Sequence, residues 1–162
     1  MKFDRVLVPL DGSPLAEVAV SWATQLAGPD ATLLLLRAAE ALALPGVDQS
    51  PAQIQVVREA EDYLTALAAR LRGEGVKNVE TSVWYGPAPS VIVEAASRRK
   101  ADLIVMSTHG RSGLGRLVMG SVAESVLRGT TTPILLVRAE GAPVEAPLGA
   151  GRARPAAETA RA

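Results

Sequence analysis

Apolar residues follow two different patterns along the chain, and the two patterns alternate. Residues 6–10, 32–36, 103–106 and 134–137 are almost entirely apolar, which is typical of strands buried on both faces of a parallel sheet. Residues 79–84 instead alternate between apolar and polar side chains, which indicates a strand with one less buried face. We expect that strand to lie at an edge of the sheet.

Apolar residues at helical spacing occupy the segments between these strands. The first two helices are expected to begin at residues 13–14 and 50–51, where a serine N-cap is followed by proline in the first turn. Their apolar stripes include Trp22 in the first helix and Ile54 in the second, and these side chains are expected to face the core. Gly28 is expected to end the first helix.

Strands that alternate with helices predict one fold class. Two shorter helices, at about residues 90–100 and 120–128, complete the pattern. Right-handed crossovers between successive strands then give an α/β fold, a doubly wound five-stranded parallel sheet with helices on both faces, as in Rossmann-like proteins. We assign the folded domain to residues 1–140. Residues 141–162 are rich in Ala, Gly, Pro and Arg and are expected to form a disordered tail.

Composition and charge exclude several classes of function. The 17 basic and 17 acidic side chains balance, so binding to nucleic acid or to an anionic membrane is not expected. The chain has no cysteine and a single histidine, His109, which excludes thiolate catalysis and any metal site that needs two imidazoles. No apolar run approaches the roughly 20 residues that span a bilayer, and residues 1–10 lack the features of a signal peptide. We therefore expect a cytoplasmic protein.

Two loops rich in small and polar residues are the candidates for ligand binding. Asp11-Gly12-Ser13 follows the first strand, and residues 107–113 follow the fourth. Ligands of a doubly wound sheet bind at the carboxyl ends of the strands where the winding reverses, and that reversal would make these two loops neighbours. Arg111 and the helix start at Gly120-Ser121 suit a phosphate, because a positive charge and free amide groups are available there. A flexible glycine loop with solvated arginines is the alternative.

The phosphate-binding fingerprints of other folds do not fit this loop. Gly110 and Gly115 have the spacing of a P-loop, but Arg116-Leu117 follows where that loop needs Lys and then Ser or Thr. Val118 stands where a dinucleotide-binding motif needs its third glycine. Neither a Walker-type loop nor a conventional dinucleotide fold is therefore predicted.

Two separated motifs point to a known family. Residues 6–13 read Val-Leu-Val-Pro-Leu-Asp-Gly-Ser. Residues 104–114 read Ile-Val-Met-Ser-Thr-His-Gly-Arg-Ser-Gly-Leu, and Gly-Ser-Val follows at residues 120–122. In this order, and with the strands predicted above, the motifs resemble the universal stress protein family, and the resemblance covers residues 3–138.

The ATP-binding branch of that family has a glycine pattern that this chain matches in part. The pattern is Gly, two residues, Gly, nine residues, and then Gly-Ser or Gly-Thr. Gly110 takes the second position, and Gly120-Ser121 follows after nine residues. Ser107 stands at the first position, where its Cβ and hydroxyl would either crowd a nucleotide or hydrogen-bond to it.

The resemblance implies an adenine nucleotide site, with ATP as the ligand and Mg²⁺ arriving with the nucleotide. Asp11 would lie near the ribose or a metal-bound water, and Ala38 would meet the adenine edge. From the residues alone, Asp11 could instead cap the first helix, Met106 could be core, and Pro9 could only end a strand. No catalytic residue and no metal site formed by the protein alone is assigned. The implied nucleotide-binding residues are Pro9, Leu10, Asp11, Ala38, Met106, Ser107, Gly110, Arg111, Gly120, Ser121 and Val122.

Three functions remain open at this point. The first is a nucleotide-binding stress-response or signalling module that forms a homodimer through residues 134–137, as the family resemblance implies. The second is an enzyme such as a weak ATP hydrolase, for which the chain offers only His109 and Asp11 beside the phosphates. The third is a dimeric scaffold that has lost nucleotide binding, marked by Ser107.

Overall fold

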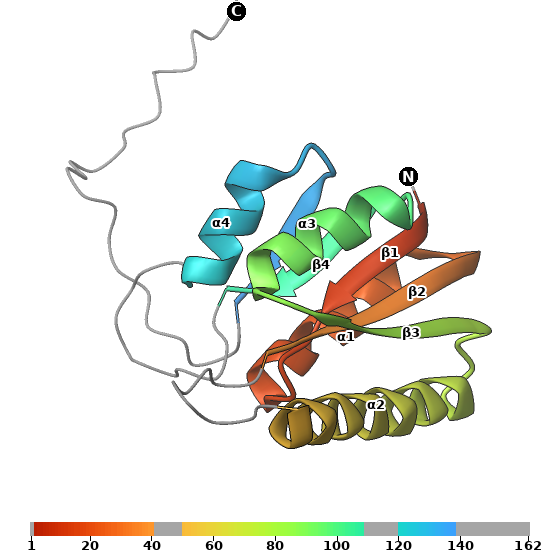
Figure 1. Cartoon of the computed structure of the whole chain (residues 1–162). Coiled ribbons are helices and arrows are strands. Elements are labelled where there is room, and N and C mark those ends of the chain that lie inside the picture. The colour runs from red at the N-terminus through yellow and green to blue at the C-terminus, as the bar shows by residue number, and fades with distance from the viewer. Residues whose placement is uncertain (1, 41–49, 109–119, 139–162) are drawn as a thin grey trace, which may run out of the picture.

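Strands and helices alternate throughout the computed structural model, which describes residues 2–40, 50–108 and 120–138 (Figure 1). The predicted elements are all present, in the predicted order. Their bounds are β1 (Phe3–Pro9), α1 (Pro14–Leu26), β2 (Ala27–Ala39), α2 (Ser50–Gly73), β3 (Asn78–Tyr85), α3 (Ala88–Arg98), β4 (Leu103–Ser107), α4 (Ser121–Gly129) and β5 (Ile134–Val137).

The strands form one parallel five-stranded sheet in the order β3-β2-β1-β4-β5, which confirms the predicted fold class. The chain winds outward from β1 to β3, then returns to the other side of β1 and continues to β5. This reversal places β1 beside β4, where Val6 is in register with Leu103 and Leu7 with Ile104. The alternating strand β3 lies at one edge, as its pattern predicted, and β5 lies at the other.

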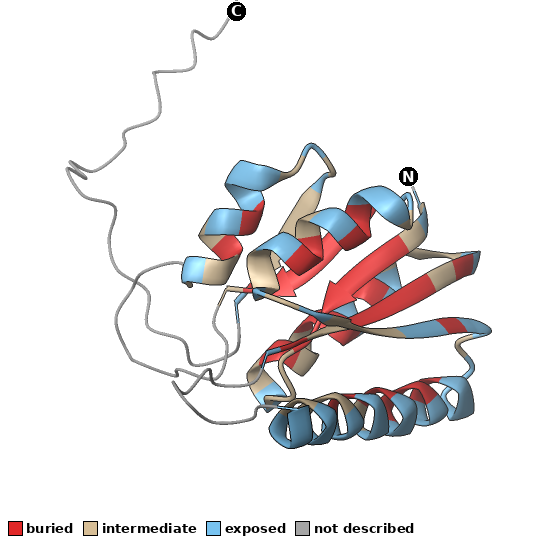
Figure 2. Cartoon of the chain, in the orientation of Figure 1, coloured by how far each residue is buried: buried red, intermediate tan, exposed pale blue. Residues whose placement is uncertain are grey.

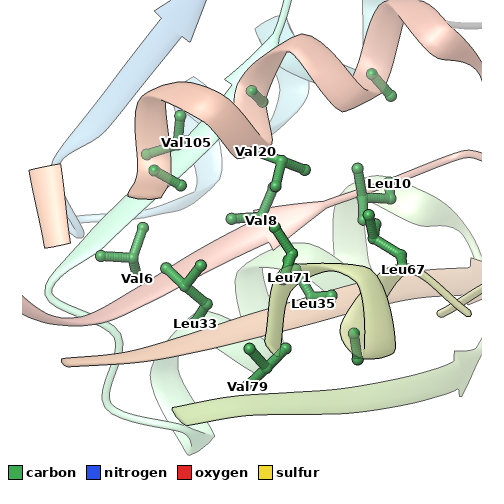
Figure 3. Packing of buried hydrophobic residues seen from close by; sticks show 14 of the residues in the cluster. Val6, Val8, Leu10, Val20, Leu33, Leu35, Leu67, Leu71, Val79 and Val105 are labelled. Atoms are coloured by element: carbon green, nitrogen blue, oxygen red, sulfur yellow. The ribbon is translucent and has the colours of Figure 1, made fainter. Parts of the chain in front are cut away.

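Helices cover both faces of the sheet. Successive side chains of a strand point to opposite faces, so each central strand contributes to the core on both sides. Val6 and Val8 of β1 pack under α1 and α2, where Figure 3 shows Val8 beside Val20 and Val6 near Leu33. Leu7, between them, packs on the other face under α3 and α4, together with Ile104. Figure 2 shows the resulting distribution, with buried residues along the central strands and on the inward sides of the helices.

Strand β2 is longer than its apolar run predicted, because it begins at Ala27, directly before the glycine that was expected to end the first helix. Helix α1 stops at Leu26, and the chain passes directly into β2. Phe3 pairs with Ala27 while Arg5 pairs with Thr32, so the register shifts between these two pairs. Residues 28–31, between these two pairs, lack the apolar pattern of a strand. They belong to β2 because this segment pairs with the start of β1.

The buried face of α1 is formed mainly by small side chains, and the predicted apolar stripe is wrong at Trp22. Ala16, Ala19, Val20 and Ala23 are buried, whereas Trp22 is 47% exposed. Alanine lets the helix axis approach the sheet closely, and the indole is left at the margin. The expectation for α2 was also wrong at its first turns, because Ile54 is 53% exposed and burial begins only at Ala60.

Two sequence-based expectations concern the ends and the environment of the chain. The division into a domain over residues 1–140 and a tail over residues 141–162 stays a prediction, since the tail lies outside the described residues. Within the described ranges, no helix combines the length and the apolar character that crossing a bilayer requires.

Candidate functional site

A cavity of about 390 Å³ opens at the carboxyl ends of the central strands. It lies where β1, β2 and β4 end and where α4 begins, the position expected for a ligand in a doubly wound sheet. Its lining residues are Pro9, Leu10, Asp11, Ala16, Leu36, Arg37, Ala38, Glu40, Val56, Ala88, Ile92, Met106, Ser107, Thr108, Gly120, Ser121, Val122 and Ala123.

Every predicted site residue within the described ranges lines this cavity. The residues come from four separate segments: the end of β1, the end of β2, the end of β4 and the start of α4. The predicted residues Gly110 and Arg111, together with His109, lie outside the described residues. The adjacency of β1 and β4 therefore brings Asp11 together with Ser107 and Thr108, the described start of the second candidate loop.

The loop after β1 is held by a short series of hydrogen bonds around Asp11. One carboxylate oxygen, Oδ1, accepts from the backbone N–H of Ser13 at 2.8 Å and from its hydroxyl at 2.6 Å. The Ser13 Oγ in turn accepts from the N–H of Ala16 at 3.2 Å and so caps α1. Leu10 ties the loop to the neighbouring strand by donating its N–H to Leu36 O at 2.8 Å. Asp11 thus supports the helix cap and lines the cavity at the same time.

Replacing Ser13 by alanine is expected to lower the free energy of unfolding by about 1 kcal/mol, because an N-cap acceptor for the first turn of α1 is lost. Asp11 would also lose the hydroxyl that its Oδ1 binds. Chemical denaturation measures the change, and Ser21→Ala on the exposed side of the same helix is the matched control. Equal stability of the two variants would show that the cap contributes nothing.

The start of α4 is fixed against the end of β4 through Gly120. Its N–H donates to Thr108 O at 2.9 Å, and the Thr108 N–H donates to Val137 O at 2.9 Å. A Cβ built on Gly120 would lie only 2.8 Å from Thr108 O, so this close approach requires glycine. No side chain among the described residues caps α4, and its first amide groups lie at the cavity with the positive end of the helix dipole.

Three predicted residues at strand ends serve both the fold and the cavity. Pro9 is the last residue of β1 and is in register with Leu36. Met106 is buried in the cluster under α3 and α4 and also lines the cavity. Ser107 ends β4, is 8% exposed and lines the cavity as well, so the cavity forms with serine at the first position of the glycine pattern. The structural interpretations of Pro9 and Met106 and their place at the cavity are therefore compatible.

Several lining residues were not predicted from the sequence. Arg37 stands directly before Ala38 at the end of β2, and its position beside a predicted residue was the one available signal. Val56, from α2, carries no such signal because only the packing of the helix brings it to the cavity. The unpredicted lining residues are Ala16, Leu36, Arg37, Glu40, Val56, Ala88, Ile92, Thr108 and Ala123.

Arg37 is held in place by an aromatic side chain of α2. Its guanidinium carbon lies 5.3 Å from the centroid of the Tyr63 ring, within range of a cation–π interaction. The Tyr63 hydroxyl donates to Glu17 Oε1 at 2.9 Å, and Arg70 donates to Oε2 of the same carboxylate at 2.9 Å. Burial, and then the hydrogen bond with Glu17, raise the pKa of Tyr63 above its ordinary value, so the hydroxyl remains a donor.

The charges at the cavity are few. Among the described lining residues, Asp11 and Glu40 are acidic and Arg37 is the only basic side chain. No group of three or more His, Cys, Asp or Glu side chains converges within the described ranges in a way that could hold a metal ion. The cavity thus presents apolar surface with a few polar groups, as small-molecule sites commonly do.

A second hollow, of about 470 Å³, lies between α1 and α2 and is lined mainly by polar side chains, including Glu17, Arg70 and Glu74. It contains no predicted site residue. Its arginine already pairs with Glu17 at 2.9 Å and with Glu74 at 3.9 Å. We therefore take the cavity at the strand ends as the candidate site.

Comparisons with known proteins agree with this fold and with the resemblance seen in the sequence. The model of the universal stress protein family matches residues 2–138. A universal stress protein of Methanocaldococcus jannaschii is 29% identical over 140 residues, which cover 84% of this chain and 82% of the relative.

Two solved structures show the same fold. The hypothetical protein MJ0577 superposes with a TM-score of 0.78 at 23% identity, over 86% of this chain and 99% of that chain. A universal stress protein in complex with cAMP superposes with a TM-score of 0.66 at 25% identity, over 85% of this chain and 98% of that chain. With the family match over nearly all of the described residues, these findings show that the chain belongs to the universal stress protein family.

Proposed function

We propose that this protein binds an adenine nucleotide, ATP foremost, in the cavity at the strand ends and acts as a stress-response or signalling module. The observation that carries the proposal is the single cavity that joins Asp11, Ala38 and Ser107 with the α4 start at Gly120-Ser121. These segments are far apart in the sequence, and the fold brings them together at the carboxyl ends of the strands.

The cavity offers the surfaces that the two parts of a nucleotide need. Its volume of about 390 Å³ lies within the usual range of roughly 300–1,000 Å³ for small-molecule sites. Leu10, Ala38 and Met106 supply apolar surface for a base. The first amide groups of α4 supply donors for a phosphate, where the helix dipole also favours negative charge.

The close approach at Gly120 supports a phosphate at the α4 start. Because Gly120 has no Cβ, the start of α4 lies close against Thr108 O, and this contact keeps the first turn of the helix at the cavity. Asp11 is the carboxylate that would meet the ribose or a water bound to Mg²⁺, and the nucleotide phosphates would carry that ion. The solved relative in complex with cAMP supports adenine as the base.

Nucleotide release is the direct test of the proposal. Denaturing freshly purified protein is expected to release an adenine nucleotide, identified by its absorbance and mass. ATP added to nucleotide-free protein at about a thousand times its dissociation constant is expected to stabilise the fold by roughly 4 kcal/mol, measured as a thermal shift. Inorganic triphosphate, which lacks the base, is the control ligand and is expected to give a much smaller shift.

The other two functions are distinguished by the same preparation. Absence of both bound nucleotide and an ATP-dependent shift would contradict the proposal and favour a dimeric scaffold. Steady ATP turnover would favour an enzyme, and a His109→Ala variant with unchanged turnover would then exclude His109 as its base.

Homodimerisation and cytoplasmic location remain predictions alongside the nucleotide site. The strand β5 lies at an edge of the sheet, and its residues Ile134, Leu135 and Leu136 are only half-buried in the single chain. A second copy that covered this edge would shield both the apolar side chains and the open backbone groups. The dimer is expected in sedimentation analysis, and Leu136→Lys is expected to shift it toward monomer.

A further inference from the structure

The geometry points to a second anion-binding position in the same cavity, at Arg37, which favours adenine nucleotides that carry a phosphoryl group on the 2′ or 3′ oxygen of the ribose. This inference rests on the proposed nucleotide site and names the substrate class that the site prefers. Three observations carry it: the path of the Arg37 side chain, the arrangement of the two faces of the sheet, and the local charge.

The Arg37 side chain leaves the sheet on the face opposite to that of its neighbour Ala38. Ala38 packs against the cluster under α3 and α4, whereas the Arg37 guanidinium lies over the Tyr63 ring of α2. From there the guanidinium reaches the loop after β1, where its Nη1 lies 3.1 Å from the position of a Cβ built on Gly12. The positive charge is therefore beside Asp11-Gly12, at the edge of the cavity.

The two anion-attracting parts of the cavity lie toward opposite faces of the sheet. The α4 start belongs to the face covered by α3 and α4, and Arg37 belongs to the face covered by α1 and α2. A nucleotide with its base at Ala38 and its 5′-phosphates at Gly120-Ser121 has its ribose near Asp11. In that pose a phosphoryl group on the 2′ or 3′ oxygen would lie near Asp11-Gly12, beside the Arg37 guanidinium.

The Arg37 guanidinium is positioned before any ligand binds. The Tyr63 ring packs against it. One carboxylate oxygen of Glu17 accepts from the Tyr63 hydroxyl, and the other accepts from Arg70, so the ring is held in turn. Among the described residues no carboxylate forms an ion pair with Arg37, whereas other arginines such as Arg99 pair with a glutamate. A half-buried guanidinium with its donors available is well suited to a phosphoryl oxygen.

Because of the charges that line the cavity, the preference for a second phosphoryl group on the ribose depends on Arg37. Asp11 and Glu40 both repel a phosphoryl group, and Arg37 is the only positively charged side chain among the described lining residues. Without the guanidinium, a second phosphoryl group on the ribose would meet two carboxylates and no cation among those residues. A nucleotide with the same phosphates attached in series at the 5′ oxygen does not reach this position.

The test compares ligands that carry two phosphates in different places. Adenosine 3′,5′-bisphosphate, adenosine 2′,5′-bisphosphate and ADP are titrated calorimetrically into the full chain, its Arg37→Gln variant and its Arg37→Lys variant. At least one bisphosphate is expected to bind the wild type about tenfold or more tightly than ADP, because a charge-assisted hydrogen bond is added. Arg37→Gln is expected to abolish that ratio, and Arg37→Lys to retain part of it.

Arg98→Ala is the matched control, because Arg98 also lies over an aromatic ring, 5.8 Å from the Trp84 centroid, but does not line the cavity. It is expected to keep the wild-type ratio, and circular dichroism establishes that each variant is folded. The two bisphosphates distinguish a 3′ from a 2′ preference. ADP binding as tightly as both bisphosphates, or an unchanged ratio in Arg37→Gln, would overturn the inference and leave the nucleotide site standing. Failure of all three ligands to bind the wild type, together with the absence of an ATP-dependent thermal shift, would overturn the proposed function itself, and this inference with it.

Discussion

Replacing Gly120 by alanine is expected to reduce nucleotide affinity by roughly tenfold to a hundredfold. The added Cβ would lie 2.8 Å from Thr108 O, a backbone atom that cannot turn aside, so the start of α4 has to move away from the end of β4. That movement strains the 2.9 Å hydrogen bond from Gly120 N to Thr108 O and displaces the amide groups proposed to hold the phosphates. Calorimetric titration with ATP measures the loss of affinity, and thermal unfolding measures an accompanying loss of about 1–3 kcal/mol.

Gly73→Ala is the matched control for this substitution. Gly73 is the last residue of α2, and a Cβ built there meets nothing within 4 Å. The control variant is expected to bind ATP as the wild type does and to unfold at the same temperature or slightly higher, because alanine favours the helix. Unchanged ATP affinity in Gly120→Ala would remove the α4 start from the nucleotide site.

Leu64→Ala is expected to cause the largest loss of stability, about 2–5 kcal/mol, because it leaves a cavity under α2. Leu64 is fully buried in the cluster that joins α1 and α2 to the sheet, and α2 is the helix that also positions Tyr63 under Arg37. The change is expected to lower the melting temperature by about 5–15 °C. Reversible thermal and chemical unfolding measure both quantities.

Ile54→Ala on the same helix is the control that separates the loss of buried surface in Leu64→Ala from the effect of alanine on helix propensity. Ile54 is 53% exposed, so the same kind of truncation removes little buried surface there. Its effect on the free energy of unfolding is expected to stay within about 0.5 kcal/mol. Similar losses for both variants would mean that α2 is not held to the sheet through the Leu64 side of the helix.

Much of the architecture could be predicted because its signals are local. The uninterrupted apolar runs at residues 103–106 and 134–137 predicted β4 and β5, and the serine-proline pair at residues 13–14 predicted the capped start of α1. The alternating pattern of residues 79–84 placed β3 at an edge. Each of these features depends on neighbours within a few positions in the chain, so each can be recognised without knowing the fold.

The errors came where distant segments decide the outcome. Trp22 fits an apolar stripe, but the sheet accepts the alanine side of α1 more closely and leaves the indole at the margin. Helix α1 does end just before Gly28, but the early start of β2 was missed, because it depends on the pairing of Ala27 with Phe3. Neither contact partner can be recognised from the residues around these positions.

The residues of the candidate site also divide into those with a local sequence signal and those placed by contacts between distant segments. Asp11, Gly120 and Ser121 were predicted because they stand in motifs of known order and spacing. Arg37 was missed because its approach to Gly12 depends on Tyr63, from another helix, and not on a motif.

The sequence by itself determined the order of strands and helices, the family and the segments from which a ligand site would be built. Hydrophobic periodicity and turn residues suffice for this, since they act over one or two turns of chain. Only the tertiary structure decided that these segments enclose one cavity, that Gly120 contacts Thr108 O, and that a tyrosine of α2 holds an arginine at its edge. Those features arise from side chains of different elements packing against each other, and packing depends on the whole fold at once.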